Sequence, residues 1–234
     1  MIHHIIASAE KMGIAVTDEQ AKKLLLYHEM LVKTNKEMNL TRVADDPIEA
    51  ADRNYLDSLS VVPYIKDAKT LIDVGTGAGF PGIPVSILCP HVRVTLMDAL
   101  NKRVGFLKSV IEALDLNAQA VHFRAEDAAK KAEFRDSFDI AAARAVAEMN
   151  VLTEWLMPFV RVGGSMLSMK GPNADDEMQR AENAISALNG KLLAIHRTQI
   201  PGRDWDHRII EIEKTAPTPD RFPRRPGVAE KKPL

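Results

Sequence analysis

The chain has 234 residues, of which 46% are hydrophobic and 27% charged, and it carries a formal net charge of −1. This length suits one large domain, or one domain with an extension, and the apolar residues are numerous enough for a core. The single cysteine, Cys89, excludes an intramolecular disulfide and a cysteine-based zinc site. No run is apolar enough to span a bilayer, and the N-terminus lacks the pattern of a secretory signal. Together these features predict a cytoplasmic protein.

The near-neutral charge argues against a protein that coats RNA, because such proteins usually show a large basic excess. The seven histidines are scattered, and none of them form a ligand-spaced pair on a predicted helix. We therefore expect no metal site.

Residues 1–66 are predicted to form an N-terminal helical extension. Thr17 and Gln20 have the spacing of a capping box, which predicts a helix that begins just after Thr17. A further helix is expected to begin at Pro47. On that helix Arg53 and Asp57 stand four residues apart, which would allow them to pair. Its predicted apolar face consists of Ala50, Ala51, Tyr55, Leu56 and Leu59.

Residues 69–84 read KTLIDVGTGAGFPGIP, and the rest of the chain is arranged around them. The apolar run from Leu71 to Val74 predicts a buried strand, and a helix is expected to begin near Pro84. A strand, a glycine-rich turn and a helix N-terminus form the nucleotide-binding corner of a doubly wound sheet. The glycines of the turn are Gly75, Gly77, Gly79 and Gly82.

The spacing of Gly77, Gly79 and Gly82 matches the dinucleotide fingerprint, but Asp73 precedes the glycines. A carboxylate favours a cationic ligand over a pyrophosphate, because opposite charges attract at short range. S-adenosylmethionine carries a sulfonium and an ammonium and has no phosphate, so the pattern favours this cofactor over NAD. An alternative stays open, in which Asp73 only orders the turn by bonding nearby N–H groups.

After this corner the chain alternates between strands and helices. Strands are predicted at 92–97, 120–124, 138–143, 165–169, 192–198 and 208–213, and helices at 101–114, 147–160 and 173–188. This alternation predicts an α/β fold with a doubly wound, mainly parallel sheet. Lys102, Arg103 and Lys108 are expected on the solvated face of their helix.

Functional groups of such sheets gather at the C-terminal ends of the strands. Asp73, Asp98, Glu126, Arg144 and Lys170 all fall at these predicted ends. Asp98 stands about 20 residues beyond the glycines, where an acid can bond a pair of ribose hydroxyls. Both NAD and S-adenosylmethionine carry that ribose, so Asp98 does not distinguish them.

Residues 221–234 form a basic, proline-rich tail with five Lys or Arg and one Glu. Proline argues against a helix or a central strand there. The tail is either a solvated terminus, an arm that contacts phosphates, or a segment that packs back on the sheet and only stabilises it.

Motifs along nearly the whole chain resemble one family. They are Asn39-Leu40-Thr41, Leu56-Asp57-Ser58-Leu59, the segment from Asp73 to Pro84, Asn101-Lys102-Arg103, Ala125-Glu126, Arg144-Ala145, Lys170-Gly171 and the ending from Pro223-Arg224 to Lys232-Pro233-Leu234. These motifs resemble the bacterial small-subunit ribosomal RNA guanine-N7 methyltransferases, also called glucose-inhibited division protein B. The Gly-Phe-Pro-Gly-Ile-Pro segment is far more specific than a generic glycine loop.

The resemblance implies a seven-stranded sheet of the class I methyltransferase type in residues 67–220. It implies S-adenosylmethionine as methyl donor and N7 of guanine 527, in the 530 loop of 16S ribosomal RNA, as acceptor. It also implies cofactor contacts at Gly75, Phe80, Ala125, Glu126 and Arg144, which add to Asp73, Gly77, Gly79 and Asp98. The family usually shows Arg-His before the Leu-Asp-Ser run, and here Arg53-Asn54-Tyr55 stands instead. No role of that histidine is carried over to Asn54.

Guanine N7 has a free lone pair at neutral pH, so methyl transfer to it needs no general base. Catalysis should rest on holding nitrogen, methyl carbon and sulfur in line. Arg144 and Lys170 are expected to position cofactor or RNA, although Lys170 could equally be structural. The candidate RNA contacts are Arg197, Arg203, Arg224, Arg225, Lys231 and Lys232.

The expected partner is 16S ribosomal RNA or the small subunit, and a monomer with no metal and no membrane is expected. Two other readings remain, an NAD-dependent oxidoreductase and a ribosome-assembly factor that binds without turnover. An oxidoreductase would need a substrate domain and a hydride-transfer histidine or tyrosine, and neither is evident.

Overall fold

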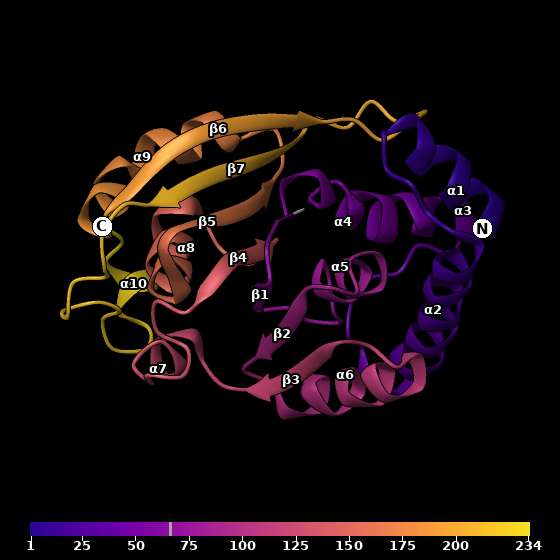
Figure 1. Ribbon diagram of the computed structural model, residues 1–234, viewed down its shortest axis with the longest axis horizontal. Helices are drawn as coiled ribbons and strands as arrows, with labels where there is room; N and C mark the ends of the chain where they lie inside the picture. Colours follow the sequence, from indigo (N-terminus) through magenta and orange to yellow (C-terminus); the bar gives the residue numbers. More distant parts are fainter. Residues whose placement is uncertain (66) are drawn as a thin grey trace.

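The computed structural model describes residues 1–65 and 67–234, and one sheet forms its centre. Within the described chain the sheet has seven strands in the order β3-β2-β1-β4-β5-β7-β6. Strand β7 runs antiparallel to β5 and β6, and the other neighbouring pairs are parallel. This confirms the predicted doubly wound, mainly parallel sheet. The strands are β1 Thr70–Val74, β2 Arg93–Asp98, β3 Ala118–His122, β4 Phe138–Arg144, β5 Val160–Lys170, β6 Gly190–Thr198 and β7 His207–Lys214 (Figure 1).

Helices cover both faces of the sheet. One face packs against α5 Gly82–Leu88 and α6 Asn101–Leu114, and the other against α8 Met149–Leu156 and α9 Ala174–Ala187. Helix α2 Asp18–Met38 packs on the outer side of α5 and α6, and α1 Ile2–Lys11 packs on α2. The shorter elements are α3 Pro47–Ala50, the π-helical turn Ala51–Leu56, α4 Asp57–Leu59, α7 Ala125–Ala128, α10 Val228–Lys231 and the 3-10 turns Val62–Tyr64 and Met157–Phe159.

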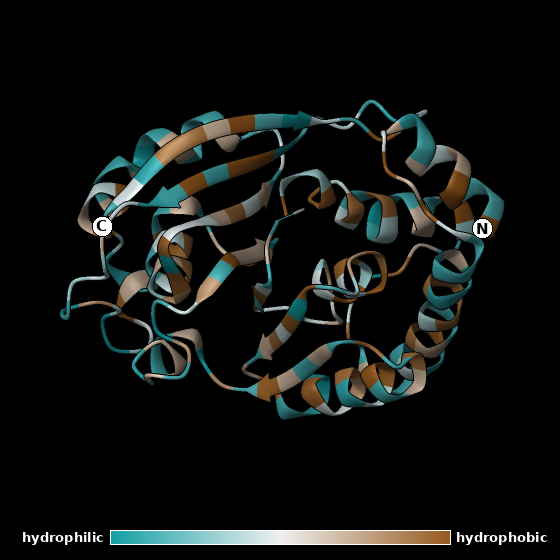
Figure 2. Ribbon diagram, viewed as in Figure 1, coloured by the Kyte–Doolittle hydropathy of each residue, from teal (hydrophilic) through white to brown (hydrophobic). Residues whose placement is uncertain are grey.

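Strand β1 shows why both faces of the sheet are apolar. Leu71 packs in the core shared with the N-terminal helices, whereas Ile72 and Val74 pack in the core on the opposite face. Successive side chains of a strand point to opposite faces, so a parallel strand covered on both sides is apolar along most of its length. Figure 2 accordingly shows hydrophobic residues along the central strands and hydrophilic ones on the outward parts of the helices.

The N-terminal helices follow the sequence prediction closely, with one error. The capping box is confirmed, since the Gln20 backbone N–H donates to Thr17 Oγ1 at 3.2 Å and the Thr17 N–H to Gln20 Oε1 at 3.0 Å. The predicted Arg53–Asp57 pair is wrong. The chain adopts π-helical turns there, and Arg53 instead pairs with Glu49 at 2.6 Å. The predicted apolar face is buried as expected.

Residue 66, the last of the predicted extension, lies outside the described residues. The helices before it and the central strands contribute to the same hydrophobic core. The predicted division of the chain into an N-terminal extension (1–66), a central domain (67–220) and a C-terminal tail (221–234) therefore stays a prediction.

Three predicted elements show the largest boundary differences from the structure. The predicted helix at 147–160 is shorter, ending at Leu156 before a 3-10 turn, because Pro158 cannot donate a helical hydrogen bond. The strand expected from residue 165 already begins at Val160, and its register with β4 shifts between Phe138 and Ile140. The strand expected at 120–124 occupies Ala118–His122.

Candidate cofactor site

Asp73 fixes the turn that follows β1. The residue is 0% exposed, and its Oδ2 accepts hydrogen bonds from Thr76 Oγ1 at 2.6 Å and from the Gly82 N–H at 2.8 Å. Its other carboxylate oxygen is buried without a hydrogen-bond partner in the described chain. Burial raises the pKa of Asp73 to about 6, against the opposing effect of the two hydrogen bonds. This geometry favours the alternative in which Asp73 orders the turn.

The glycines after Asp73 serve two different purposes. Gly77 has a φ of +63° with open space around it, so its backbone approaches a ligand freely. A Cβ at Gly82 would instead lie 2.2 Å from Leu96 Cδ2, which makes Gly82 a close-packing position. Gly79 and Phe80 lie behind the turn, where Phe80 packs against Tyr27 and is 4% exposed.

Asp98 ends β2 and holds the glycine turn from the other side. Its Oδ2 accepts from the Gly77 N–H at 2.9 Å and from Arg103 Nη1 at 3.2 Å, and its Oδ1 accepts from the Leu100 N–H at 2.9 Å. Arg103 was predicted on the solvated face of its helix, and that prediction is wrong. Its side chain is only 30% exposed, because the paired Asp98 draws it over the end of the sheet.

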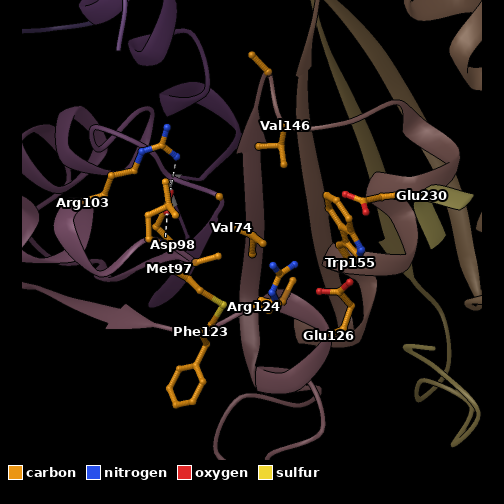
Figure 3. Close-up of a pocket in the computed structure, with 15 residues that line it drawn as sticks. Val74, Met97, Asp98, Arg103, Phe123, Arg124, Glu126, Val146, Trp155 and Glu230 are labelled. Carbon is orange, nitrogen blue, oxygen red and sulfur yellow. Dashed lines mark hydrogen bonds and ion pairs between the residues drawn. The ribbon is translucent and has the colours of Figure 1, made fainter. Parts of the chain in front are cut away.

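A cavity of about 310 Å³ opens between these strand ends. Gly75, Asp98, Ala125 and Glu126 line it, as the sequence predicted for a cofactor site. Figure 3 shows Asp98 and Arg103 on one side, and Glu126, Trp155 and Glu230 on the other. Asp73, Gly77, Gly79, Phe80 and Arg144 are not part of this lining.

Arg103, Trp155 and Glu230 are lining residues that the sequence analysis missed. Arg103 had a usable signal, since it follows the strand-end acid by five positions, about one helical turn into α6. Trp155 and Glu230 had none, because only the packing of α8 against α10 brings them together.

The polar groups around this cavity fit a nucleoside bearing a cationic side chain. Asp98 offers carboxylate acceptors to a ribose hydroxyl pair. The buried Trp155 indole N–H, on the cavity wall, has no hydrogen-bond partner within the described residues. The carboxylates of Glu126 and Glu230 on the cavity wall complement a positive charge, and S-adenosylmethionine carries a ribose hydroxyl pair, acceptors on its base and a positive charge.

A second cavity of about 700 Å³ adjoins the first and shares Ala145 and Val146 with it. Arg42, Arg53, Arg144, Lys170 and Arg208 line it, which makes it rich in cations. Such a lining suits the phosphates and base of a polynucleotide.

Arg144 is the centre of a hydrogen-bonded network in the second cavity. Its Nη1 donates to Asp57 Oδ2 at 3.0 Å and to the Arg53 carbonyl at 2.8 Å, and its guanidinium lies 4.8 Å from the Phe80 ring centre. His207 Nδ1 lies 2.8 Å from Asp57 Oδ1. The hydrogen bond to Asp57 raises the pKa of His207 above its usual range. Arg144 thus joins the N-terminal helices to the glycine turn.

Asn54 and Lys170 also line the second cavity. Lys170 donates to the Ala147 carbonyl and to Glu177 Oε2, the latter at 2.7 Å, and it is 8% exposed. Asn54 is 5% exposed, and its buried amide nitrogen has no hydrogen-bond partner among residues 1–65 and 67–234. Lys170 is therefore held in place, whereas the Asn54 donor is unengaged.

Of the six predicted RNA contacts, two are engaged within the protein. Arg203 pairs with Asp52 at 2.7 Å, and Arg224 pairs with the buried Glu154 at 2.5 Å. The others, Arg197, Arg225, Lys231 and Lys232, are exposed. An RNA role for all six stays a prediction.

Neither a metal centre nor a membrane span is found in the part of the chain that the structure describes. No group of three or more His, Cys, Asp or Glu side chains there could hold a metal ion. None of its helices is both long and apolar enough to cross a bilayer.

Solved methyltransferases share this architecture. The O-methyltransferase from Bacillus cereus in complex with SAH has a TM-score of 0.57 at 18% identity, over 92% of this chain and 100% of that one. TYW2 from M. jannaschii in complex with AdoMet has a TM-score of 0.54 at 13% identity, over 69% of this chain and 77% of that one. With this likeness, the strand order and the cavity at the strand ends define a class I methyltransferase fold.

Sequence comparison narrows this class to one family. A family model described as rRNA small subunit methyltransferase G matches residues 20–205. The ribosomal RNA small subunit methyltransferase G of Clostridium perfringens (strain SM101 / Type A) is 42% identical over 230 residues, 97% of this chain and 96% of that protein. The protein of that name from Alkaliphilus metalliredigens is 43% identical over 228 residues, 96% of this chain and 95% of that protein. The chain belongs to the rRNA small subunit methyltransferase G family.

Proposed function

We propose that this chain transfers a methyl group from S-adenosylmethionine to N7 of guanine 527 in the 530 loop of 16S ribosomal RNA. The observation that carries the proposal is the pair of cavities with a common wall at Ala145 and Val146. One cavity has acidic groups suited to a cationic nucleoside, and its neighbour has cations suited to RNA. The names of the relatives support small-subunit ribosomal RNA as the substrate. The SAH and AdoMet complexes of the structural neighbours support the donor.

The cofactor, when bound, supplies an electrophilic methyl group on a sulfonium. Asp98 would bind the ribose hydroxyls while Gly77 and Arg103 hold its carboxylate in place. Asp73 keeps the glycine turn in shape through Thr76 and Gly82. These residues would therefore fix the donor side of the reaction.

The acceptor side would be set by the second cavity. Arg144, held by Asp57, would position the guanine, and Lys170, held by Glu177, would contact a neighbouring phosphate. The lone pair of N7 attacks without first losing a proton, so none of these residues needs to act as a base. The chain's contribution to the rate is then alignment and exclusion of water.

A ribosomal RNA substrate supports a location in the bacterial cytoplasm. We propose that it acts as a monomer on 16S RNA or on the small subunit, because both cavities are formed by residues of one chain.

The proposal is tested by incubating the protein with methyl-labelled S-adenosylmethionine and, separately, naked 16S RNA, small subunits and whole ribosomes. Transfer of label to RNA in at least one arm is expected. Calorimetry on the same protein should show binding of S-adenosylhomocysteine and none of NAD. Binding of NAD alone would favour an oxidoreductase, and cofactor binding without label transfer in every arm would favour an assembly factor.

A further inference from the structure

The C-terminal segment, residues 222–231, reaches the first cavity. Glu230 of α10 lines that cavity together with Trp155 of α8 (Figure 3). Helix α10 packs against α8 (Figure 1), and Glu230 lies on the side of the cavity opposite Asp98 and Arg103 (Figure 3). A segment that merely trailed into solvent would not reach this position.

Two anchors hold the C-terminal segment in place. The Phe222 side chain is 4% exposed and joins the hydrophobic core on the α8 face. The Arg224 guanidinium bonds both oxygens of Glu154, and its backbone N–H donates to Glu154 Oε1 at 2.8 Å. Glu154 is 1% exposed, so this charge depends on Arg224 for its partner. The anchors therefore define the path of the residues that follow them.

A third contact reaches the cavity itself. The Gly227 N–H donates to Glu126 Oε1 at 3.2 Å. Glu126 lines the cavity and is 5% exposed. Gly227 has a φ of +77°, a left-handed conformation that directs its N–H toward Glu126 at little cost for glycine. The tail thus contacts a cavity carboxylate that lies about one hundred residues earlier in the chain.

We propose that residues 222–231 are an integral part of the cofactor site. The Gly227 N–H positions Glu126, Glu230 closes the cavity beside Trp155, and cofactor affinity depends on docking of the segment. Coupling is reciprocal, so a bound cofactor also stabilises the docked tail. This inference rests on the proposed function, because it takes the adenosine-bearing cofactor as the ligand of the cavity.

The test replaces Gly227 by proline, which lacks the N–H and cannot adopt a positive φ. The matched control is Gly202→Pro in the β6–β7 connection. Gly202 also follows a proline and has a φ of +80°, and a Cβ there would meet no atom within 4 Å. Calorimetry with S-adenosylhomocysteine should show roughly tenfold weaker binding by Gly227→Pro, as loss of a hydrogen bond to a charged group implies. Gly202→Pro should bind like the wild type.

Hydrogen exchange on the wild-type chain gives a second measurement that does not depend on folding of any variant. Saturation with S-adenosylhomocysteine should slow exchange of the amides in 222–231 at least several-fold. Unchanged tail exchange on saturation, or wild-type affinity in a folded Gly227→Pro, would overturn this inference alone. If the wild-type chain did not bind S-adenosylhomocysteine at all, the proposed function would fail first and this inference with it.

Discussion

The ionisation of Asp73 should make the free energy of unfolding depend on pH, because the carboxyl is fully buried. Its pKa is about 6 in the folded chain and 3.8 in the reference state, so the native state holds the extra proton between those values. Stability from this group is therefore greatest at low pH and falls as pH rises from about 4 to about 6.

Asp73→Asn keeps an acceptor oxygen for Thr76 and Gly82 but cannot ionise. The unfolding free energy of this variant, relative to wild type, should therefore rise with pH across that window. A pKa difference of about two corresponds to about 3 kcal/mol at most. Urea titrations at several pH values between 4 and 7 provide the measurement. A difference that does not vary with pH would show that Asp73 titrates normally.

His207 should act in the same sense as Asp73, but in a higher pH range. Its pKa is raised above 6.5 chiefly by the hydrogen bond to Asp57, with Arg144 and Arg53 opposing the shift. The stabilisation is fully present below about pH 6.5 and is lost as pH rises through the raised value. His207→Gln should therefore be less stable than wild type at pH 6, and the difference should shrink by pH 9. A melting-temperature difference that is constant from pH 6 to 9 would contradict this expectation.

The positions of the residues at the strand ends were predictable, because a parallel sheet brings the C-terminal ends of its strands to one edge regardless of side-chain conformation. Asp98 and Glu126 line the cavity for that reason. The direction of a side chain was not predictable, and Arg103 shows why. Its position on the helix was equally compatible with an exposed side chain. The side chain turns inward because Asp98, at the end of β2, is close enough to pair with it.

The glycine turn between β1 and α5 should tolerate a side chain at one position and not at another. A Cβ at Gly77 would meet no neighbouring atom closer than 4.0 Å, although the positive φ of Gly77→Val costs about 1–2 kcal/mol. The fold should survive, with S-adenosylhomocysteine binding weakened about tenfold or more, because strain at this φ would displace the backbone N–H that orients Asp98.

Gly82→Val provides the contrast for this experiment. Its Cβ would fall 2.2 Å from Leu96 Cδ2 and 2.8 Å from Asp73 Oδ2, so the fold itself should be lost. Thermal unfolding by circular dichroism distinguishes the two variants. Wild-type cofactor affinity in Gly77→Val would mean that the ligand lies elsewhere.

The elements themselves were largely predictable, since the apolar periodicity of each strand and helix depends only on local sequence. The helix at 101–114 matches α6 at both ends. The insertion of β7 between β5 and β6 could not be deduced in the same way. The order of two neighbouring strands depends on which edge each one covers, and that is decided by packing against α9 and β5.

The net charge of −1 means that RNA must be held by local clusters of cations. In the C-terminal tail Arg225, Lys231 and Lys232 are exposed, whereas Arg224 is paired with Glu154. Replacing the three exposed residues by Gln should reduce the magnitude of the negative slope of log affinity against log salt by about two to three, because up to three phosphate contacts are removed. The affinity for S-adenosylhomocysteine should not change, because these side chains are absent from the cavity lining. Filter binding of the RNA substrate at 50 to 300 mM salt measures the slope. An unchanged slope would mean that the tail does not bind RNA, and would favour Arg144 and Lys170 as the RNA contacts.

The tail was the part of the chain that sequence patterns described least well. Its prolines and positive charges were compatible with solvent, an RNA arm or packing on the sheet. The structure shows Phe222 and Ala229 buried and Gly227 bonded to Glu126. No local pattern could have shown this, because each of those contacts needs a partner far upstream in the chain.

The family shows that the chain methylates small-subunit ribosomal RNA, and our proposal is that the acceptor is a single guanine. We would incubate the protein with methyl-labelled S-adenosylmethionine and unmethylated 16S RNA or small subunits, then map the product by mass spectrometry of nuclease fragments. The expected result is N7-methylguanosine at position 527, with about one methyl group per RNA molecule. Label at another nucleotide, or on a ring or ribose atom other than N7, would contradict the proposed activity.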